Sequence, residues 1–225
     1  MISSVCGSAV NGMPEPGSAQ VVEWAVRTRG RRGARVTGDH GMVVRIGGGV
    51  LVVAVDGLGH GPAAAVAARE ADAVVHRNAE RTRGDLAALM VEFHAGLRDT
   101  RGASVSLAFL PVGTDTMTWL GVGDVEGRVI RVRQGGRDGG LSLLLLPGLI
   151  GHELPALKTR TAAVRRGDLV AFASDGVRRD FADRLNGAGS PASIAERILS
   201  AHWDGADDAL IIVLRRLGRP PVTAS

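Results

Sequence analysis

The chain has 225 residues, of which 45% are hydrophobic and 3% aromatic, so it can bury a core of its own within one domain. Cys6 is the sole cysteine, which excludes an internal disulfide and a cysteine-based zinc site and predicts a reducing, cytoplasmic location. The formal net charge is +4 and the positive charge is nearly all arginine, a usage that does not by itself indicate a nucleic-acid partner.

The sequence predicts neither secretion nor membrane insertion. Residues 1–20 lack a basic start followed by an apolar stretch, and the longest aliphatic run, Leu141–Leu146, is far shorter than the ~20 residues that cross a bilayer. Residues 1–19 are rich in Gly, Ser and Pro and are predicted to form a flexible tail, as are residues 217–225. We expect residues 20–216 to form the folded domain.

The sequence of the first part of this domain predicts three strands. Residues 21–26 are expected to form an edge strand, and a loop rich in Arg and Gly follows it as far as Asp39. Two apolar runs, residues 42–46 and 50–55, flank three glycines and predict a β-hairpin. Asp56 therefore lies where the second strand of this hairpin ends.

Two helices are expected next. Pro62 is tolerated at a first helical position and opens an Ala-rich segment that extends to about Asn78. Asp85 is placed to cap a second helix, whose apolar residues recur at helical spacing. These residues are Leu86, Leu89, Met90, Phe93 and Leu97.

The remainder of the chain predicts mainly short strands, with two helices near residues 178–185 and 191–202. The expected strands are residues 104–110, 116–122, 128–132, 141–146, 159–164, 169–173 and 209–214. Strands at such close spacing indicate antiparallel pairing and not a regular alternation of strand and helix. We therefore predict an α+β fold, a four-layer α-β-β-α sandwich in which two packed antiparallel sheets are flanked by helices.

Carboxylates lie beside the ends of several predicted strands. Asp39, Asp56, Asp175 and the pair Asp207-Asp208 each adjoin an apolar run. A strand that carries an Asp to its exposed end holds an anionic oxygen on a rigid support, and several such ends brought together would repel one another unless a cation lay between them. The pattern therefore predicts a metal-dependent enzyme.

Other catalytic signatures do not fit. The segment from Asp56 to Gly61 runs from a strand through a glycine turn to a helix, but its spacing differs from a dinucleotide fingerprint and its Asp would repel a pyrophosphate. A phosphate-binding loop with Lys and Ser, a Gly-x-Ser-x-Gly elbow and a second histidine after His152-Glu153 are all missing from the sequence.

Taken together and in this order, the acidic motifs resemble those of the metal-dependent serine/threonine protein phosphatases, the PPM or type 2C superfamily. Within it, Asp56-Gly57-Leu58-Gly59-His60-Gly61 is similar to the bacterial branch of sporulation and stress-response phosphatases, and the short chain is closest in plan to a stressosome phosphatase. The other matching motifs are Thr37-Gly38-Asp39, Gly121-Val122-Gly123-Asp124, Ala173-Ser174-Asp175-Gly176-Val177 and Asp207-Asp208-Ala209. The resemblance covers about residues 20–216 and implies a central antiparallel β-sandwich flanked by helices.

The resemblance also implies a reaction and a set of ligands. The reaction is hydrolysis of phosphoserine or phosphothreonine on a regulatory protein, by water that two divalent cations, Mn²⁺ or Mg²⁺, activate without a covalent intermediate. By the same resemblance, Asp56 bridges both ions and the Gly57 carbonyl completes one site. Asp175 and Asp207 hold the other ion, and Asp39 acts mainly through water.

Residues around this acidic set are candidates for supporting roles. One cluster of arginines comprises Arg27, Arg29, Arg31, Arg32 and Arg35. This cluster is either part of a solvated loop or a rim that binds phosphate oxygens. Arg32 and Arg35 are the candidate phosphate ligands. His60 and Asp208 are candidates for supporting the metal ligands. Binding of nucleic acid through the same cluster is a third and weaker hypothesis.

Two positions depart from the family pattern. Asp124 is often Asn in relatives, and Leu210 stands where a small hydroxyl residue usually follows the last acidic pair. These departures keep a second hypothesis open, in which the chain is a catalytically silent phosphatase-fold protein that binds and regulates a signalling partner. The retained acidic residues favour the enzyme.

Overall fold

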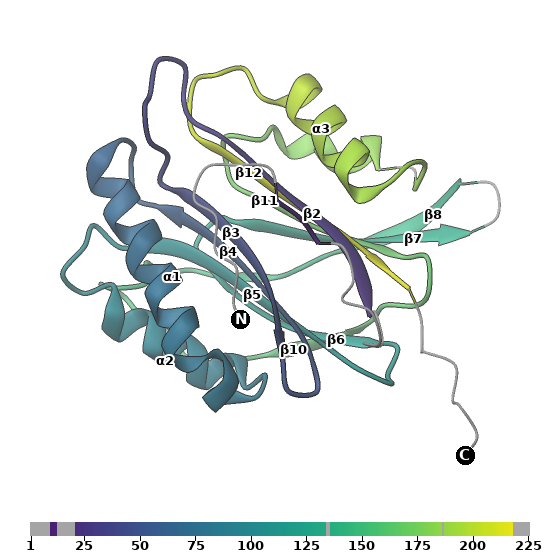
Figure 1. Ribbon diagram of the computed structural model, residues 1–225, viewed down its shortest axis with the longest axis horizontal. Helices are drawn as coiled ribbons and strands as arrows, with labels where there is room; N and C mark the ends of the chain where they lie inside the picture. Colours follow the sequence, from purple (N-terminus) through teal and green to yellow (C-terminus); the bar gives the residue numbers. More distant parts are fainter. Residues whose placement is uncertain (1–9, 13–20, 134–135, 186, 218–225) are drawn as a thin grey trace.

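In a computed structural model, which describes residues 10–12, 21–133, 136–185 and 187–217, two β-sheets pack between helices (Figure 1). The first sheet consists, in spatial order, of β1 (Val10–Gly12), β2 (Val22–Arg29), β12 (Ala209–Arg216), β11 (Leu169–Ala173), β7 (Glu126–Arg133) and β8 (Gly136–Ser142). The second consists of β10 (Arg160–Ala163), β6 (Thr116–Val122), β5 (Ala103–Pro111), β4 (Gly49–Gly57) and β3 (Asp39–Ile46), with β9 (Leu145–Leu146) also paired to β6. All of these pairs are antiparallel except β6 with β9.

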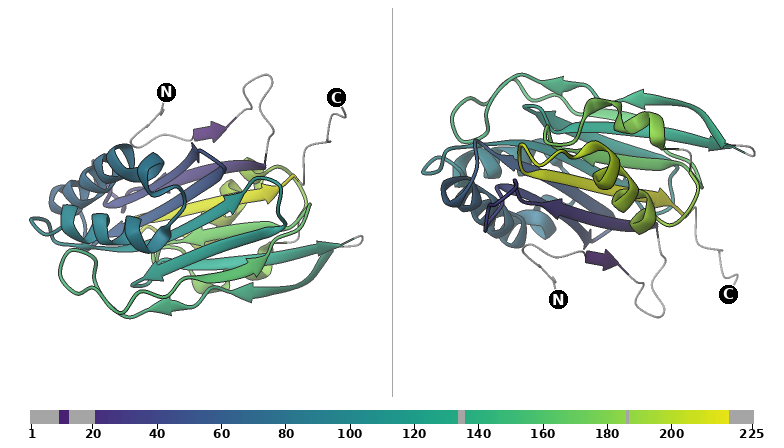
Figure 2. Two further views of the ribbon diagram at one scale, coloured as in Figure 1. Left: turned by 90° about the horizontal axis from the view of Figure 1, so that it is seen from below. Right: turned by 90° about the horizontal axis from the view of Figure 1, so that it is seen from above.

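Helices cover the outer faces of both sheets and complete a four-layer sandwich (Figure 2). α1 (Pro62–Thr82) and α2 (Leu86–Gly96) cover the second sheet, whereas α3 (Pro191–His202) and the short 3₁₀-helix η1 (Arg179–Arg184) cover the first. Three apolar clusters fill the interfaces between the layers, one under α1 and α2, one between the sheets and one under α3. The predicted α+β sandwich is confirmed.

The β3–β4 hairpin carries two of the acidic motifs. Gly48 in its turn has a φ of +96°, in the left-handed region that favours glycine. Residues 50–55 are all buried because β4 is an inner strand, with α1 on one face and the first sheet on the other. The register of the hairpin pairs Asp39 with Asp56 at its open end.

Both α1 and α2 begin where the sequence predicts. Pro62 is the first residue of α1, where a missing backbone donor costs nothing, and the helix continues beyond the expected end to Thr82. The side chain of Asp85 caps α2 by accepting hydrogen bonds from the backbone N–H groups of Ala87 and Ala88, over 3.1 and 3.0 Å. The predicted cap is therefore confirmed.

Asp85→Ala is expected to lower the free energy of unfolding by about 1 kcal/mol, because two N–H groups of the first turn of α2 lose their acceptor. Asp99→Ala is a matched control, since Asp99 is an exposed aspartate in the turn after α2. Urea denaturation of both variants and the wild type at one pH measures the difference. An equal loss in the two variants would contradict the capping role.

The predicted single strand over residues 141–146 is wrong, because the chain changes sheet within this run. Residues up to Ser142 belong to β8 and pair with β7, whereas Leu145 and Leu146 form β9 and pair with β6 in the other sheet. Leu143 is buried between the sheets at the crossing, and Leu144 is exposed. A continuous apolar run carries no signal of such a change of partner.

Three further expectations differ in detail. Residues 178–185 contain the 3₁₀-helix η1 instead of an α-helix. The predicted edge strand is β2, which pairs with β12 on one side and with the three-residue β1 on the other. β1 falls within the predicted N-terminal tail; the rest of that tail, like residues 218–225, lies outside the described residues.

No helix in the described ranges is long and apolar enough to cross a membrane.

Candidate metal centre

The predicted acidic residues lie at ends of strands from both sheets. Asp39 begins β3 and Asp56 lies near the end of β4, opposite Asp39 in the register. Asp175 follows β11, and Asp207 and Asp208 directly precede β12. Because β11 and β12 are antiparallel neighbours, the end of one and the start of the other lie at the same edge of their sheet.

The Ser174 hydroxyl connects these two sheet edges. It donates a hydrogen bond to Asp39 Oδ2 over 2.5 Å and accepts one from the backbone N–H of Leu210 over 2.8 Å. The side chains of Ser174 and Asp39 are both buried. The Leu210 N–H occupies one of the acceptor positions of the Ser174 hydroxyl. The hydroxyl proton of Ser174 is therefore directed at Asp39. Ser174 belongs to one of the sequence motifs, but sequence reasoning assigned it no role.

Leu210, which departs from the family pattern, is a core residue. It is fully buried in the apolar cluster between the sheets. A Cβ on Gly41 would come within 2.8 Å of Leu210 Cδ1, so the leucine fills the space that this glycine leaves. The hydroxyl beside Asp39 therefore comes from position 174 and not from position 210.

The buried Asp208 carboxylate anchors the loop over residues 30–38, which joins β2 to β3. Its Oδ1 accepts a hydrogen bond from the backbone N–H of Arg31 over 2.7 Å, and its Oδ2 accepts one from Gly38 over 2.8 Å. Gly176 allows a close approach here, since a Cβ at that position would lie 1.8 Å from the Asp208 carbonyl oxygen. Asp208 thus holds the loop that leads directly into Asp39.

Burial and mutual repulsion raise the pKa values of three carboxyl groups in this centre, those of Asp39, Asp56 and Asp175. Burial first, then the charges of Asp39 and Asp175, raise the pKa of Asp56 to about 10. Burial also raises the pKa of Asp39 to about 7, although the Ser174 hydrogen bond opposes the shift. The hydrogen bond between Asp39 and Asp56 raises the pKa of Asp56 and lowers that of Asp39, so the two carboxyl groups titrate as a coupled pair.

Asp175 and Asp207 belong to the same electrostatic group. Burial, followed by the charges of Asp124 and Asp207, raises the pKa of Asp175. Asp207 is half-buried, and its Oδ1 accepts a hydrogen bond from the backbone N–H of Asp208. The indole N–H of Trp203 donates to the Asp207 carbonyl over 2.9 Å, which fixes the backbone on the α3 side.

Asp124, whose role the sequence left open, also faces this group. Its charge raises the pKa values of Asp56 and Asp175, so its carboxylate lies near both. Its backbone N–H donates to the hydroxyl of Ser104, and Ser104 is the register partner of Asp56. The preceding Gly123 permits this approach, since a Cβ there would lie 2.2 Å from that hydroxyl oxygen. The Gly123-Asp124 pair was the only sequence signal for it.

The donor set fits hard divalent cations. The charged groups that converge are all carboxylates, and oxygen ligands are those that Mn²⁺ and Mg²⁺ prefer. Burial is the main cause of the raised pKa values of Asp39, Asp56 and Asp175, and the repulsion between neighbouring carboxylates adds to it. Bound cations would relieve that repulsion. Within the described residues, no three His, Cys, Asp or Glu side chains are already gathered around one point that would hold an ion.

In metal-free protein, stability is expected to fall as pH rises from about 4 to about 10. Asp56 keeps its proton in the folded state up to a pKa of about 10 but loses it near 3.8 when unfolded, so folding becomes less favourable across this window. Asp56→Asn removes this group and should flatten the dependence. Denaturant midpoints in EDTA at pH 5, 7 and 9 measure the slope. Asp99→Asn should leave the slope unchanged, and an unchanged slope in Asp56→Asn would contradict the assignment.

Most of the arginine cluster is engaged elsewhere. Arg27 and Arg29 form ion pairs with Glu196 on α3, and the Arg29 guanidinium also lies over the Trp203 ring, 5.3 Å from its centroid. Arg32 donates from Nη2 to the Asp204 carbonyl over 3.0 Å. The cluster is therefore largely a structural contact between the β2–β3 region and the α3 side of the molecule.

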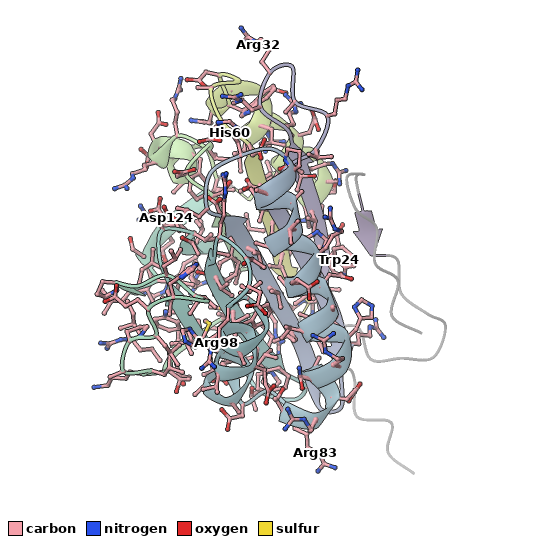
Figure 3. The ribbon with its side chains drawn as sticks, turned by 90° about the vertical axis from the view of Figure 1, so that its left-hand side faces the viewer. Trp24, Arg32, His60, Arg83, Arg98 and Asp124 are labelled. Atoms are coloured by element: carbon pink, nitrogen blue, oxygen red, sulfur yellow. The ribbon has the colours of Figure 1, made fainter. Side chains whose placement is uncertain are left out.

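The two predicted phosphate ligands are placed differently. Arg32 lies at the tip of its loop, at the top of Figure 3. Arg35 lines a cavity that also reaches Asp39. His60 is exposed in the loop between β4 and α1, and Figure 3 places it and Asp124 in the upper half of the view, far from Arg83 at the other end of α1. Within the described residues His60 makes no hydrogen bond to a metal-ligand candidate.

Comparison with known proteins identifies the family. Residues 46–219 match the family model for stage II sporulation protein E (SpoIIE). The chain belongs to the SpoIIE family. A search of the curated proteins found no match.

Several solved structures share the fold of this chain. RsbX in complex with magnesium is 18% identical, with a TM-score of 0.78 over 93% of this chain and 100% of that chain. A structure of the bacterial stressosome, a modular system adapted to control secondary messenger signaling, is 27% identical, with a TM-score of 0.77 over 87% of this chain and 100% of that chain. The catalytic domain of the serine/threonine phosphatase PstP with 2 manganese ions is 17% identical, with a TM-score of 0.63 over 88% and 99%. The resemblance to PPM-type phosphatases is confirmed.

Proposed function

We propose that this SpoIIE-family chain hydrolyses phosphoserine or phosphothreonine on a regulatory protein and that it uses two divalent cations, Mn²⁺ or Mg²⁺. The observation that carries the proposal is the convergence of Asp39, Asp56, Asp175 and Asp207 from strands of both sheets, with pKa values raised in Asp39, Asp56 and Asp175. The related folds of RsbX and PstP, solved with magnesium and manganese, support it.

Each residue has a proposed part in holding the ions. Asp56 would be a ligand of both ions, and the Gly57 carbonyl would be a further ligand of one of them. Asp175 and Asp207 would hold the other ion, and Asp39 would act through water. When bound, such cations neutralise the phosphate charge and lower the pKa of a water molecule.

The chain's own groups orient the reaction. The Ser174 hydroxyl holds Asp39 in one position, and Asp208 fixes the loop that precedes it. Arg35 contacts the phosphate oxygens, which its guanidinium can bind bidentately. Water then attacks phosphorus directly, the serine or threonine oxygen leaves with a proton, and no side-chain nucleophile is needed.

The test is hydrolysis of an aryl phosphate and of a phosphoserine protein by the purified chain with added Mn²⁺. We expect activity that EDTA abolishes and that both Asp56→Ala and Asp175→Ala lose, while Asp99→Ala keeps it. Absence of activity with metal, or its survival in both site variants, would overturn the proposal. Calorimetric titration with Mn²⁺ separates the enzyme from a catalytically silent relative, because a silent protein has no need to bind the ions.

The regulatory substrate is proposed from the same comparisons. The similar chain from the stressosome belongs to a system that controls signalling, and regulatory proteins that carry a phosphoserine are therefore the substrates we propose. A phosphoprotein that accumulates when the gene is deleted, and that the purified chain dephosphorylates, would identify the natural substrate.

A further inference from the structure

A cavity of about 590 Å³ lies between the loop over residues 30–38 and the first half of α1. Arg35 and Val36 line it from the loop, and Ala65 and Arg69 line it from α1. It also reaches Asp39, one of the carboxylates of the candidate metal centre. A space of this volume accommodates a small ligand or a few residues of a peptide.

Two cationic groups of this cavity are left without a partner. Arg35 and Arg69 are exposed, and within the described part of the chain neither forms a hydrogen bond or an ion pair. This differs from Arg27 and Arg29, which both pair with Glu196.

The carboxylate of Asp72 in the same wall is already engaged. His40 Nε2 lies 3.2 Å from its Oδ1, and His76 Nδ1 lies 3.3 Å from its Oδ2. The Asp39 carboxylate, which also lines the cavity, is engaged too, because it accepts the Ser174 hydrogen bond. Among the described residues, the charged groups of the cavity wall that remain without a partner are therefore the two guanidinium groups, which favour an anionic ligand.

We propose that this cavity binds the segment that flanks the phosphorylated residue, and that Arg69 selects substrates with a second anionic side chain close to the phosphoserine. This inference rests on the proposed function, in which Arg35 contacts the phosphate that is hydrolysed. Arg69 then faces a second oxyanion. A guanidinium binds carboxylate and phosphate with the same forked geometry, so the second anion is an Asp or Glu side chain or another phosphate.

The test compares three phosphoserine peptides of one sequence, in which the residues on both sides of the phosphoserine are Glu, phosphoserine or Gln. We measure kcat/KM for each with Mn²⁺ and use an aryl phosphate as a substrate too small to fill the cavity. Wild-type protein is expected to favour one or both anionic peptides over the Gln peptide by about threefold to tenfold. The better of the two identifies the second anion as carboxylate or phosphate.

Arg69→Gln is expected to remove this preference through KM and to leave hydrolysis of the aryl phosphate unchanged. Arg77→Gln is the matched control, because Arg77 is an exposed arginine on the same helix that does not line the cavity. Arg77→Gln should keep the preference. Equal kcat/KM for all three peptides in the wild type, a preference that survives in Arg69→Gln, or an equal loss in Arg77→Gln would each overturn the inference.

Binding of the same peptides, labelled and in EDTA, separates this inference from the proposed function. Fluorescence anisotropy then reports the affinity without turnover. Hydrolysis of the aryl phosphate with no Arg69-dependent preference in either measurement would overturn the subsite and leave the phosphatase assignment intact. Tighter Arg69-dependent binding of the anionic peptides, with no hydrolysis of any substrate, would support the subsite and contradict the phosphatase assignment.

Discussion

Asp56→Asn is expected to lower Mn²⁺-dependent hydrolysis of a phosphoserine protein by at least ~10³-fold, because the proposed bridging ligand loses its charge while its size is kept. Asp56 is the residue on which the burial and the charges of this centre act most strongly, with a pKa raised to about 10. Calorimetry should show a matching loss of Mn²⁺ affinity. Steady-state kinetics with the phosphoserine protein and with an aryl phosphate measure the change in rate.

The fold of Asp56→Asn should remain intact. In metal-free protein Asp56 already holds a proton, so a neutral amide replaces a neutral acid of nearly the same shape. At pH 8 we expect the variant to unfold in EDTA at a denaturant concentration at least as high as that of the wild type. If Asp56→Asn were both inactive and unfolded, its inactivity would not test the role of the Asp56 charge. Asp56→Glu then serves as a second variant, because it keeps the charge but displaces the carboxylate. Wild-type rates in Asp56→Asn would contradict the ligand assignment.

Asp208→Ala is expected to lower the free energy of unfolding by about 3 kcal/mol, because the part-buried N–H of Arg31 and the buried N–H of Gly38 both lose a charged acceptor. The loop that carries Asp39 into the centre would lose its anchor, so activity should also fall by about 10-fold to 100-fold. Asp208→Asn keeps one acceptor oxygen and should be intermediate in both respects. Urea denaturation in EDTA and kinetics with Mn²⁺ measure the two effects.

Asp204 provides the control for Asp208. It is an exposed aspartate in the same connection, and among the described residues its Oδ1 accepts only from the backbone N–H of Ala206 within its own turn. Asp204→Ala should therefore cost about 1 kcal/mol or less and leave activity near the wild-type value. If Asp208→Ala were as stable and as active as Asp204→Ala, the anchoring role of Asp208 would be wrong.

Predictions from the sequence were accurate where the signal is local. The alternation of buried runs with glycine turns placed the β3–β4 hairpin, and Pro62 and Asp85 marked the starts of α1 and α2. These features depend on neighbouring residues only, through backbone geometry and capping. The run over residues 141–146 failed because its two ends pair with different sheets, which depends on strands far away in the chain.

The candidate metal centre also combines features that the sequence predicted with contacts that it could not show. Asp39, Asp56, Asp175 and Asp207 were identifiable because each adjoins a strand and belongs to a family motif. The sequence could not show that the Ser174 hydroxyl would reach Asp39, 135 residues away, or that Asp208 would hold residues 31 and 38. Nor could it separate Arg35, which lines the cavity, from Arg32, which is bound to the Asp204 carbonyl.

The sequence by itself determined most of the strands and helices, the α+β class and the acidic residues, because hydrophobic periodicity, caps and motifs are properties of short segments. The tertiary structure alone decided which of these residues meet, since β11 and β12 come from the end of the chain and β3 and β4 from its beginning. Packing the two sheets against each other sets the burial and the mutual repulsion of their carboxylates, and these raise the pKa values of Asp39 and Asp56.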